Sequence, residues 1–199
     1  MSADTQFHVH HDAPEVVGRR ERLGVRLLIV ADGAFLFGMI FTFFYLKNLN
    51  NSGSWLPQEH GHMFSKSSGW LAALPLVVAF VSHKMGQRNP KTIGNISIIT
   101  FMALAFGLIY QINQMSHMPF YIKDVNGFDG AYASSWVLLA GANTFHYIIG
   151  TFIALGLVIR ARRAEVDPTL EKWRIRVAAS WFTWIAVSGV ICATVLSLA

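Results

Sequence analysis

The stretch LGVRLLIVADGAFLFGMIFTFFYL, residues 23–46, decides the fold class of this chain. A helix needs about 20 mostly apolar residues to cross the hydrocarbon core of a bilayer. This stretch meets that length, and Arg26 and Asp32 are its only charged residues. It is therefore predicted to be a transmembrane helix.

Four further segments pass the same test, at residues 68–85, 92–115, 131–159 and 175–198. The composition agrees, because 53% of the residues are hydrophobic and only 14% are charged, whereas soluble domains carry about 25% charged residues. We predict an all-α integral membrane protein, with a five-helix bundle over residues 23–199 and a polar cytoplasmic tail over residues 1–22. The connections are too short for a second domain.

Thirteen of the 16 Lys and Arg residues fall on one side of the predicted bundle. They lie in the tail and the start of the first span, between the second and third spans, and between the fourth and fifth. The other side carries only Lys47, Lys66 and Lys123. Positively charged loops stay in the cytoplasm, so we expect a cytoplasmic N-terminus and an outside C-terminus. The basic residues flank apolar segments and form no stripe with aromatic residues, which argues against a nucleic-acid partner.

Asp32 is the ionisable residue that most needs an explanation. It lies nine residues after Leu23, about 14 Å along a helix, and so close to mid-bilayer. A charge at that depth costs at least a few kcal/mol and normally faces the bundle interior or a water path. Two interpretations stay open: Asp32 handles protons, or it makes a purely structural buried hydrogen bond.

Other polar residues also fall within the spans. The third span ends with Tyr110 and Gln111, and the fourth carries Asn143 and His146. Asn143 and His146 are three positions apart and therefore share a helix face. We predict an interior polar network of these four residues. Helix packing by interhelical hydrogen bonds is the favoured interpretation of Asn143 and His146.

The sequence offers no metal or catalytic centre of its own. Cys192 is its single cysteine, and His146 is predicted to be the only histidine in the interior, with His83 at a span boundary. Membrane haem and copper centres need several His ligands. No G-x-S-x-G, H-E-x-x-H or Walker-type motif is present. A partner that performs the chemistry becomes the natural hypothesis.

Two stretches carry a resemblance to a known family. ADGAFLF (residues 31–37) has a small residue, a carboxylate and an aromatic-rich run, and GLIYQINQ (107–114) has Gly107 and Tyr110 but Gln111 where an acid is expected. Both are similar to subunit III of the haem-copper oxidases, in its short five-helix bacterial form. The resemblance extends along nearly the whole chain after the tail.

The last two spans continue this resemblance with substitutions. YASSWVLLAGANTFHYIIG (132–150) matches at Gly141 and His146 and has Asn143 in place of a histidine. WFTWIAVSGV (181–190) departs most, and keeps the aromatic residues Phe182 and Trp184. The positions at which the family has His, Asp and Trp hold Thr183, Ala186 and Gly189. Asp32 is the main acidic residue of the family pattern that this sequence retains.

The resemblance implies an accessory, non-catalytic subunit of a respiratory terminal oxidase in a bacterial cytoplasmic membrane. Such a subunit packs against catalytic subunit I, which holds the haem and copper. It stabilises that subunit during turnover, holds phospholipid in a cleft and lies near the entrance of a proton-uptake path. The implied place of Asp32 is in that cleft.

Two alternatives remain from the sequence. A subunit III-like partner of nitric oxide reductase would fit the replaced signature residues. A small transporter or channel would use Asp32 to bind or relay a cation, although the odd number of spans and the lack of an internal repeat argue against it. The electron donor, cytochrome c or quinol, is left open.

Overall fold

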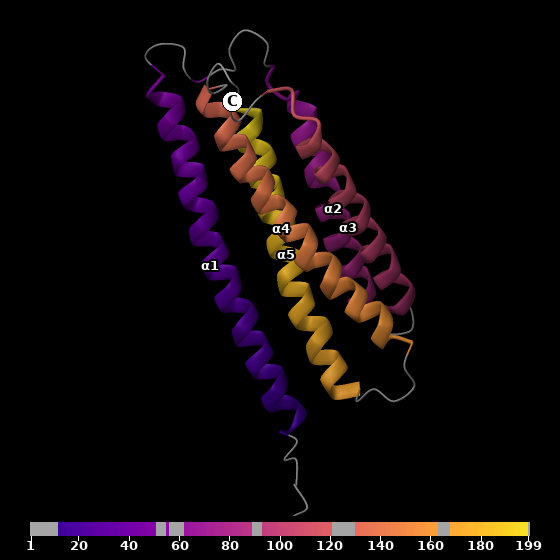
Figure 1. Ribbon diagram of the computed structural model, residues 1–199. Coiled ribbons are helices and arrows are strands. Elements are labelled where there is room, and N and C mark those ends of the chain that lie inside the picture. Colours follow the sequence, from indigo (N-terminus) through magenta and orange to yellow (C-terminus); the bar gives the residue numbers. More distant parts are fainter. Residues whose placement is uncertain are drawn as a thin grey trace, which may run out of the picture.

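The computed structural model describes residues 12–50, 55, 62–88, 93–120, 130–162 and 168–198. These segments form five long helices and contain no strand (Figure 1). The helices are α1 (Pro14–Asn48), α2 (Lys66–Arg88), α3 (Ile93–Ser116), α4 (Gly130–Arg160) and α5 (Pro168–Ser197). Each predicted span coincides with one of them, so the prediction of five helices is confirmed.

Two helices begin well before the predicted spans. α1 begins at Pro14 and α5 at Pro168, so residues 14–22 of the predicted polar tail are helical. Residues 1–11 of the predicted tail lie outside the described residues. The 35 residues of α1 extend over about 52 Å at 1.5 Å per residue, whereas the hydrocarbon core is about 30 Å thick. The polar start of α1 therefore has room to project beyond the apolar band.

Packing explains why these two polar helix starts are ordered. Gly18 of α1 is buried against Trp173 of α5, where a Cβ on Gly18 would lie only 2.4 Å from the Trp173 Cγ atom. Beside this contact, Glu21 and Arg174 form an ion pair at 3.8 Å. Hydropathy alone misses these turns, because tertiary contacts between the two helix starts stabilise them.

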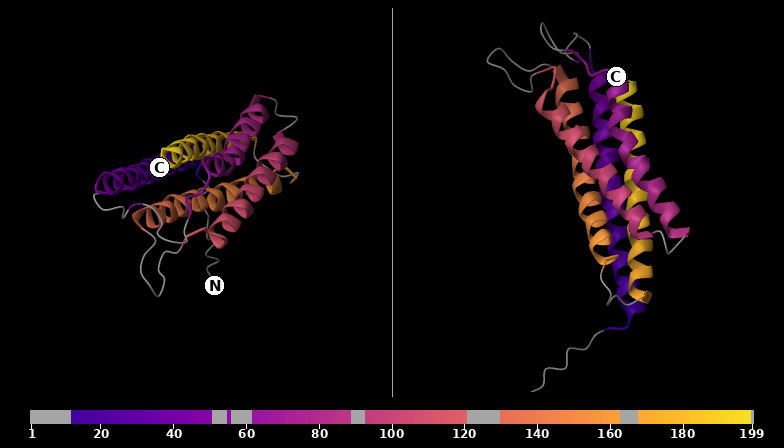
Figure 2. Two further views of the ribbon diagram at one scale, coloured as in Figure 1. Left: turned by 90° about the horizontal axis from the view of Figure 1, so that it is seen from above. Right: turned by 90° about the vertical axis from the view of Figure 1, so that its right-hand side faces the viewer.

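The helices form a ring in the order α1, α4, α3, α2 and α5, in which each packs on the next. α5 closes the ring on α1, and α4 also contacts α5. The view from above shows α1 beside α5, with α2 and α3 together at the far end of the bundle (Figure 2). Segments distant in sequence thus meet on the inner faces of α1, α4 and α5.

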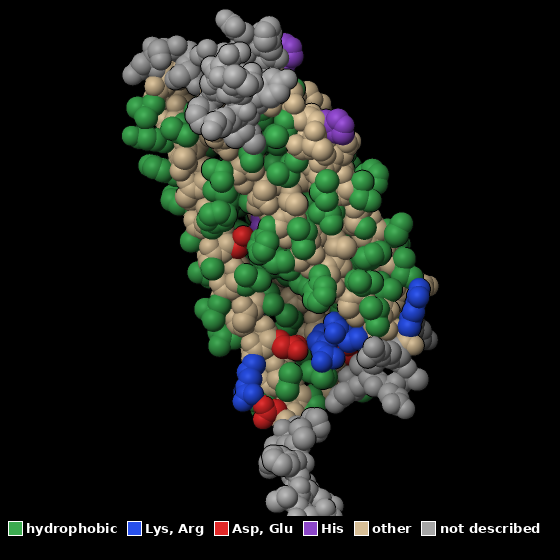
Figure 3. Space-filling view, viewed as in Figure 1, with side chains coloured by type: hydrophobic (Ala, Val, Ile, Leu, Met, Phe, Trp, Pro, Cys, Tyr) green, Lys and Arg blue, Asp and Glu red, His purple; other side chains and the backbone are tan. Residues whose placement is uncertain are grey.

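All five helices are long and apolar enough to cross a membrane, which indicates a multi-pass membrane protein. Large hydrophobic side chains cover the outer surface, with Phe37 71% and Phe152 77% exposed. Figure 3 shows hydrophobic side chains over the middle of one face and Lys and Arg gathered toward the end at which α1 begins. α5 ends at the opposite end of the bundle (Figure 1). The described basic residues therefore follow the distribution that predicts a cytoplasmic N-terminus; Lys91, Lys123 and Arg163 lie outside the described residues.

The interior contains two hydrophobic clusters, one toward each end of the bundle. The first joins the second half of α1 to the start of α4 and the end of α5, and is rich in aromatic rings such as Phe43, Tyr132 and Trp136. The second surrounds Tyr147, Trp181 and Phe182 in the other half. Trp184 packs against both clusters. Trp184 therefore lies where the two clusters meet.

Pro75 lies inside α2 and perturbs the backbone hydrogen bonds of the preceding turn, since proline has no N–H and its ring clashes with the carbonyl four residues earlier. One residue after the carbonyl that Pro75 affects, the Ala72 carbonyl accepts a hydrogen bond from the Tyr147 hydroxyl at 2.5 Å. Tyr147 reaches this position by lying against Gly107, where a Cβ would be only 2.2 Å from the Tyr147 ring. The bond joins α4 to α2 in the turn that precedes the proline.

Candidate functional site

Asp32 faces the interior of the bundle, as the sequence predicted. The buried residues of α1 around it are Leu36, Met39 and Phe43, at the spacing of one helix face. This face lies against α4 and α5, and the Asp32 side chain keeps only 8% of its surface exposed. The helix therefore places the carboxylate between three helices and away from lipid.

Two donors from different helices converge on one oxygen of Asp32. His146 Nε2 of α4 lies 2.8 Å from Asp32 Oδ2, and Trp184 Nε1 of α5 donates to the same oxygen at 2.5 Å. These partners are 114 and 152 positions away in the sequence. A buried carboxylate must be paired or hydrogen bonded to be tolerated, and this one accepts hydrogen bonds from two side chains.

The second ring nitrogen of His146 also has a partner. Nδ1 lies 3.3 Å from the Ser188 hydroxyl of α5, and the Ser188 hydroxyl lies 3.1 Å from the carbonyl of Ile185. His146 and Ser188 are both fully buried. We call Asp32, His146, Trp184 and Ser188 the Asp32 cluster.

The Asp32 cluster has two protonation schemes that leave every heavy atom in place. In one, a neutral imidazole donates from Nε2 to the carboxylate and accepts the Ser188 hydroxyl proton at Nδ1. In the other, an imidazolium donates from both nitrogens, and the Ser188 hydroxyl donates to the Ile185 carbonyl. The arrangement can therefore hold or release one proton by rotating a single hydroxyl group.

The cluster shares the Asp–His–Ser connectivity of a hydrolase triad, but its Ser188 is fully buried. A nucleophilic serine has to meet a substrate carbonyl beside donors that stabilise the oxyanion. Ser188 instead lies mid-helix, with its hydroxyl near the carbonyl of Ile185. The geometry favours proton holding over acyl transfer.

Gly33 explains part of the motif around Asp32. A Cβ at Gly33 would lie 3.3 Å from the Cη2 atom of Trp184, so the absence of a side chain lets the indole lie directly against α1. On α5, Trp184 and Ser188 are four residues apart and therefore share a face. The glycine after Asp32 thus admits the Trp184 ring, and the four-residue spacing on α5 places Trp184 and Ser188 on the same side of that helix.

The predicted polar network of Tyr110, Gln111, Asn143 and His146 proves to be divided. Gln111 and Asn143 are joined, since Asn143 Nδ2 donates to Gln111 Oε1 at 3.1 Å. Tyr110 bonds to Gln114 of its own helix at 3.0 Å, and His146 belongs to the Asp32 cluster. The described residues therefore contain three separate groups, because each helix turn directs these side chains toward different neighbours.

The sequence interpretation missed three residues of the interior. Trp184 was noted only as a retained aromatic residue, and Ser188 was not noted; their four-residue spacing on one helix was the available signal. His83, expected at a span boundary, is buried at 1% exposure, with Nε2 3.1 Å from the Ile175 carbonyl. His146 is therefore not the only interior histidine.

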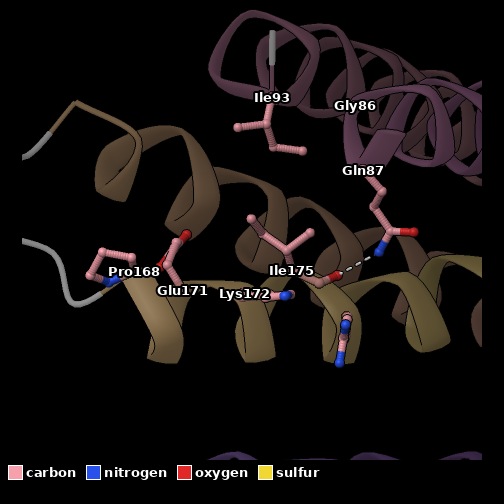
Figure 4. Close-up of a pocket in the computed structure, with 8 residues that line it drawn as sticks. Gly86, Gln87, Ile93, Pro168, Glu171, Lys172 and Ile175 are labelled. Carbon is pink, nitrogen blue, oxygen red and sulfur yellow. Dashed lines mark hydrogen bonds between the residues drawn. The ribbon is translucent and has the colours of Figure 1, made fainter. Parts of the chain in front are cut away.

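A separate cavity of about 580 Å³ lies at the basic end, where α5 begins. Figure 4 shows Glu171, Lys172 and Ile175 of α5 on one side, and Gln87 of α2 and Ile93 of α3 on the other. Gln87 Nε2 donates to the Ile175 carbonyl at 3.1 Å, the dashed line in that view. Asp32 is not among the lining residues, so the cavity is distinct from the Asp32 cluster.

Within the described segments, no three His, Cys, Asp or Glu side chains group so that they could hold a metal ion.

No protein-family model matches the chain, and no curated protein matches it at a significant level.

Proposed function

We propose that the protein is an accessory, non-catalytic subunit III of a bacterial respiratory haem-copper terminal oxidase. In this role it packs in the cytoplasmic membrane against catalytic subunit I, which carries the haem and copper. It stabilises that subunit during oxygen reduction, holds phospholipid and supports proton uptake. The N-terminus lies in the cytoplasm and the C-terminus outside.

One observation carries the proposal: Asp32 and His146 are hydrogen bonded across two helices at 2.8 Å. The sequence resemblance matched these two residues independently, in stretches far apart in the chain. In the bundle the two matched residues belong to one interior group. This contact supports the resemblance, because it is a spatial relation that the separate sequence matches do not contain.

The chemistry of the Asp32 cluster supports a proton-related role. An intramembrane carboxylate and imidazole mark proton relays in membrane proteins, and the cluster holds or releases a proton with no heavy-atom motion. The four residues are supplied by α1, α4 and α5. The same contacts stabilise the packing of these helices, so proton handling and bundle stability are coupled in one group.

The testing experiment is gentle detergent purification through a tag on this chain. A reduced-minus-oxidised haem spectrum and mass spectrometry then identify what co-purifies. A His-rich catalytic subunit with haem and copper supports the proposal. An untagged strain taken through the same column controls for abundant oxidase that adheres nonspecifically.

The same experiment separates the alternatives. Co-purified nitric oxide reductase would identify the other partner considered from the sequence and would overturn the oxidase assignment. A colourless chain that survives purification alone would contradict an accessory role. That outcome would direct attention to cation flux in proteoliposomes, with Asp32→Asn as the variant that a transporter could not tolerate.

A further inference from the structure

A small cavity of about 20 Å³ lies among α2, α3, α4 and α5. Its polar lining residues are Ser68, Gln111, Gln114 and Asn143, and Cys192 lies on the α5 side. A cavity needs roughly 10–15 Å³ of such volume to hold one water molecule, and the water needs two to four polar partners. The space and its lining meet both requirements for one water.

Asn143 presents an unpaired oxygen in this part of the interior. The residue is 6% exposed, and while Nδ2 donates to Gln111, the buried Oδ1 has no partner in the protein. Exchanging the amide nitrogen and oxygen would not help, because the atom that faces away from Gln111 would still be polar and unpaired. Leaving such a buried group without a hydrogen bond costs about 1–3 kcal/mol.

Gly189 of α5 leaves this oxygen uncovered. A Cβ at Gly189 would lie 3.8 Å from Asn143 Oδ1 and 2.5 Å from Leu76 Cδ1. Any larger residue at this position would therefore intrude on Leu76 and cover the amide. The glycine therefore allows α2 and α5 to pack closely and adds no side chain beside the amide oxygen.

We infer that this cavity holds one structural water molecule, which donates a hydrogen bond to Asn143 Oδ1. The lining groups of Gln111, Gln114 and Ser68 supply the further polar partners that such a water needs. The water satisfies the amide pair that links α3 to α4. The site is independent of the proposed oxidase role, since it follows from the packing of this chain alone.

The inferred water site adjoins the Asp32 cluster on both α4 and α5. Asn143 precedes His146 by three residues on α4, and Gly189 directly follows Ser188 on α5. In the Asp32 cluster, protein groups from two helices donate to Asp32 Oδ2. In the Gln111–Asn143 pair, we infer that water supplies the missing partner of Asn143 Oδ1.

Radiolytic hydroxyl-radical footprinting of the purified full-length chain tests this inference, because bound water that is ionised in place labels the side chains beside it. We expect Trp136 and Cys192, which are buried and line the cavity, to be labelled in the wild-type protein. Asn143→Leu removes the water ligand at similar volume and should abolish that labelling. Trp181 lies outside the cavity lining and serves as the internal reference.

Thr144→Val is the matched control, since it changes the next residue of α4 but leaves the cavity lining intact. It should retain the labelling of Trp136 and Cys192. Equal labelling in wild type and Asn143→Leu would overturn the inference. If Asn143→Leu does not fold, a high-resolution map of the wild-type protein decides: density within hydrogen-bonding distance of Asn143 Oδ1 supports the water, and an empty cavity refutes it.

Discussion

The bundle contains two kinds of ion pair, and they differ in depth. Asp32 and His146 pair at 2.8 Å near the middle of the helices, with side chains 8% and 0% exposed. At the basic end, Glu21 and Arg174 pair at 3.8 Å with side chains 34% and 29% exposed, and Arg160 and Glu171 pair at 3.7 Å. Asp12 and Arg20 also form a close hydrogen-bonded pair, with side chains 47% and 70% exposed. The Asp32–His146 pair therefore differs from the other pairs in its burial, and not in its contact distance alone.

The difference follows from the surrounding medium. Water screens an exposed pair and leaves it worth about 0–1 kcal/mol whatever the distance between its atoms. A buried pair has lost its hydration, and losing one partner leaves an uncompensated charge. Because the Asp32 cluster is buried, the loss of any one of its hydrogen bonds should lower the stability of the protein measurably. Substitutions that remove these bonds one at a time test this.

The largest effect is expected from His146→Leu. The variant removes the imidazole and leaves Asp32 with Trp184 as its remaining described donor, which should destabilise the protein by about 3–5 kcal/mol. Unfolding in mixed micelles, followed by tryptophan fluorescence, would measure the loss.

The double variant Asp32→Leu/His146→Leu is the informative control for that experiment. Replacing both members of a buried ion pair by apolar residues is often neutral or stabilising, so it should recover most of the lost stability. If the double variant were as unstable as His146→Leu, packing rather than charge would explain the effect.

The next effect is expected from Trp184→Phe. Phenylalanine keeps an aromatic ring but removes the indole donor to Asp32, and hydrogen bonds to charged groups contribute about 1.5–3 kcal/mol. The same unfolding measurement applies.

Trp181→Phe is the matched comparison for Trp184→Phe. Trp181 is fully buried, and its Nε1 atom has no hydrogen-bond partner in the protein. The Trp181 substitution therefore reports the change in ring volume without loss of a hydrogen bond. Equal destabilisation by the two substitutions would mean that the Trp184–Asp32 bond adds nothing to packing.

A smaller effect on stability, but a specific effect on function, is expected from Asp32→Asn. The amide keeps an oxygen that can accept from Trp184 and His146, so the stability should change less than in Trp184→Phe. The proposed function predicts that, in the complex purified through this chain, initial turnover stays near normal while proton uptake or durability during turnover is altered. Oxygen consumption followed over many turnovers, together with proton uptake, would measure this.

Asp12→Asn provides the control for Asp32→Asn, because Asp12 pairs with Arg20 at an exposed position. This substitution makes the same chemical change outside the apolar band. It should leave turnover, proton uptake and durability unchanged. If Asp32→Asn behaved identically, Asp32 would be a structural residue without a proton-related role.

The sequence predicts the five helices because each apolar segment is long enough to cross a bilayer, and this property is local. It also predicts that Asp32 faces inward, since a charge in lipid is costly. The early starts of α1 and α5 depend instead on the contact of Gly18 with Trp173. No local pattern reports a contact between residues so distant in the chain.

The partners of Asp32 are hidden from the sequence for a related reason. Whether His146, Trp184 or Tyr110 meets Asp32 depends on the rotation of each helix about its axis, and ring closure by α5 fixes that rotation. Polar residues can be assigned to the interior one by one, but their grouping requires the packed bundle. This is why one predicted network became three groups.

The smallest effect is expected at the half-buried pair of Glu21 and Arg174. Glu21→Gln and Arg174→Gln should each change stability by no more than about 1 kcal/mol, with a coupling energy in a double-mutant cycle that falls as salt rises, because exposed charges are screened. The same cycle at Asp32 and His146 should give a larger coupling that responds little to salt. A coupling at Glu21 and Arg174 equal to the buried one would contradict depth as the cause. Charge complementarity alone would then account for both pairs.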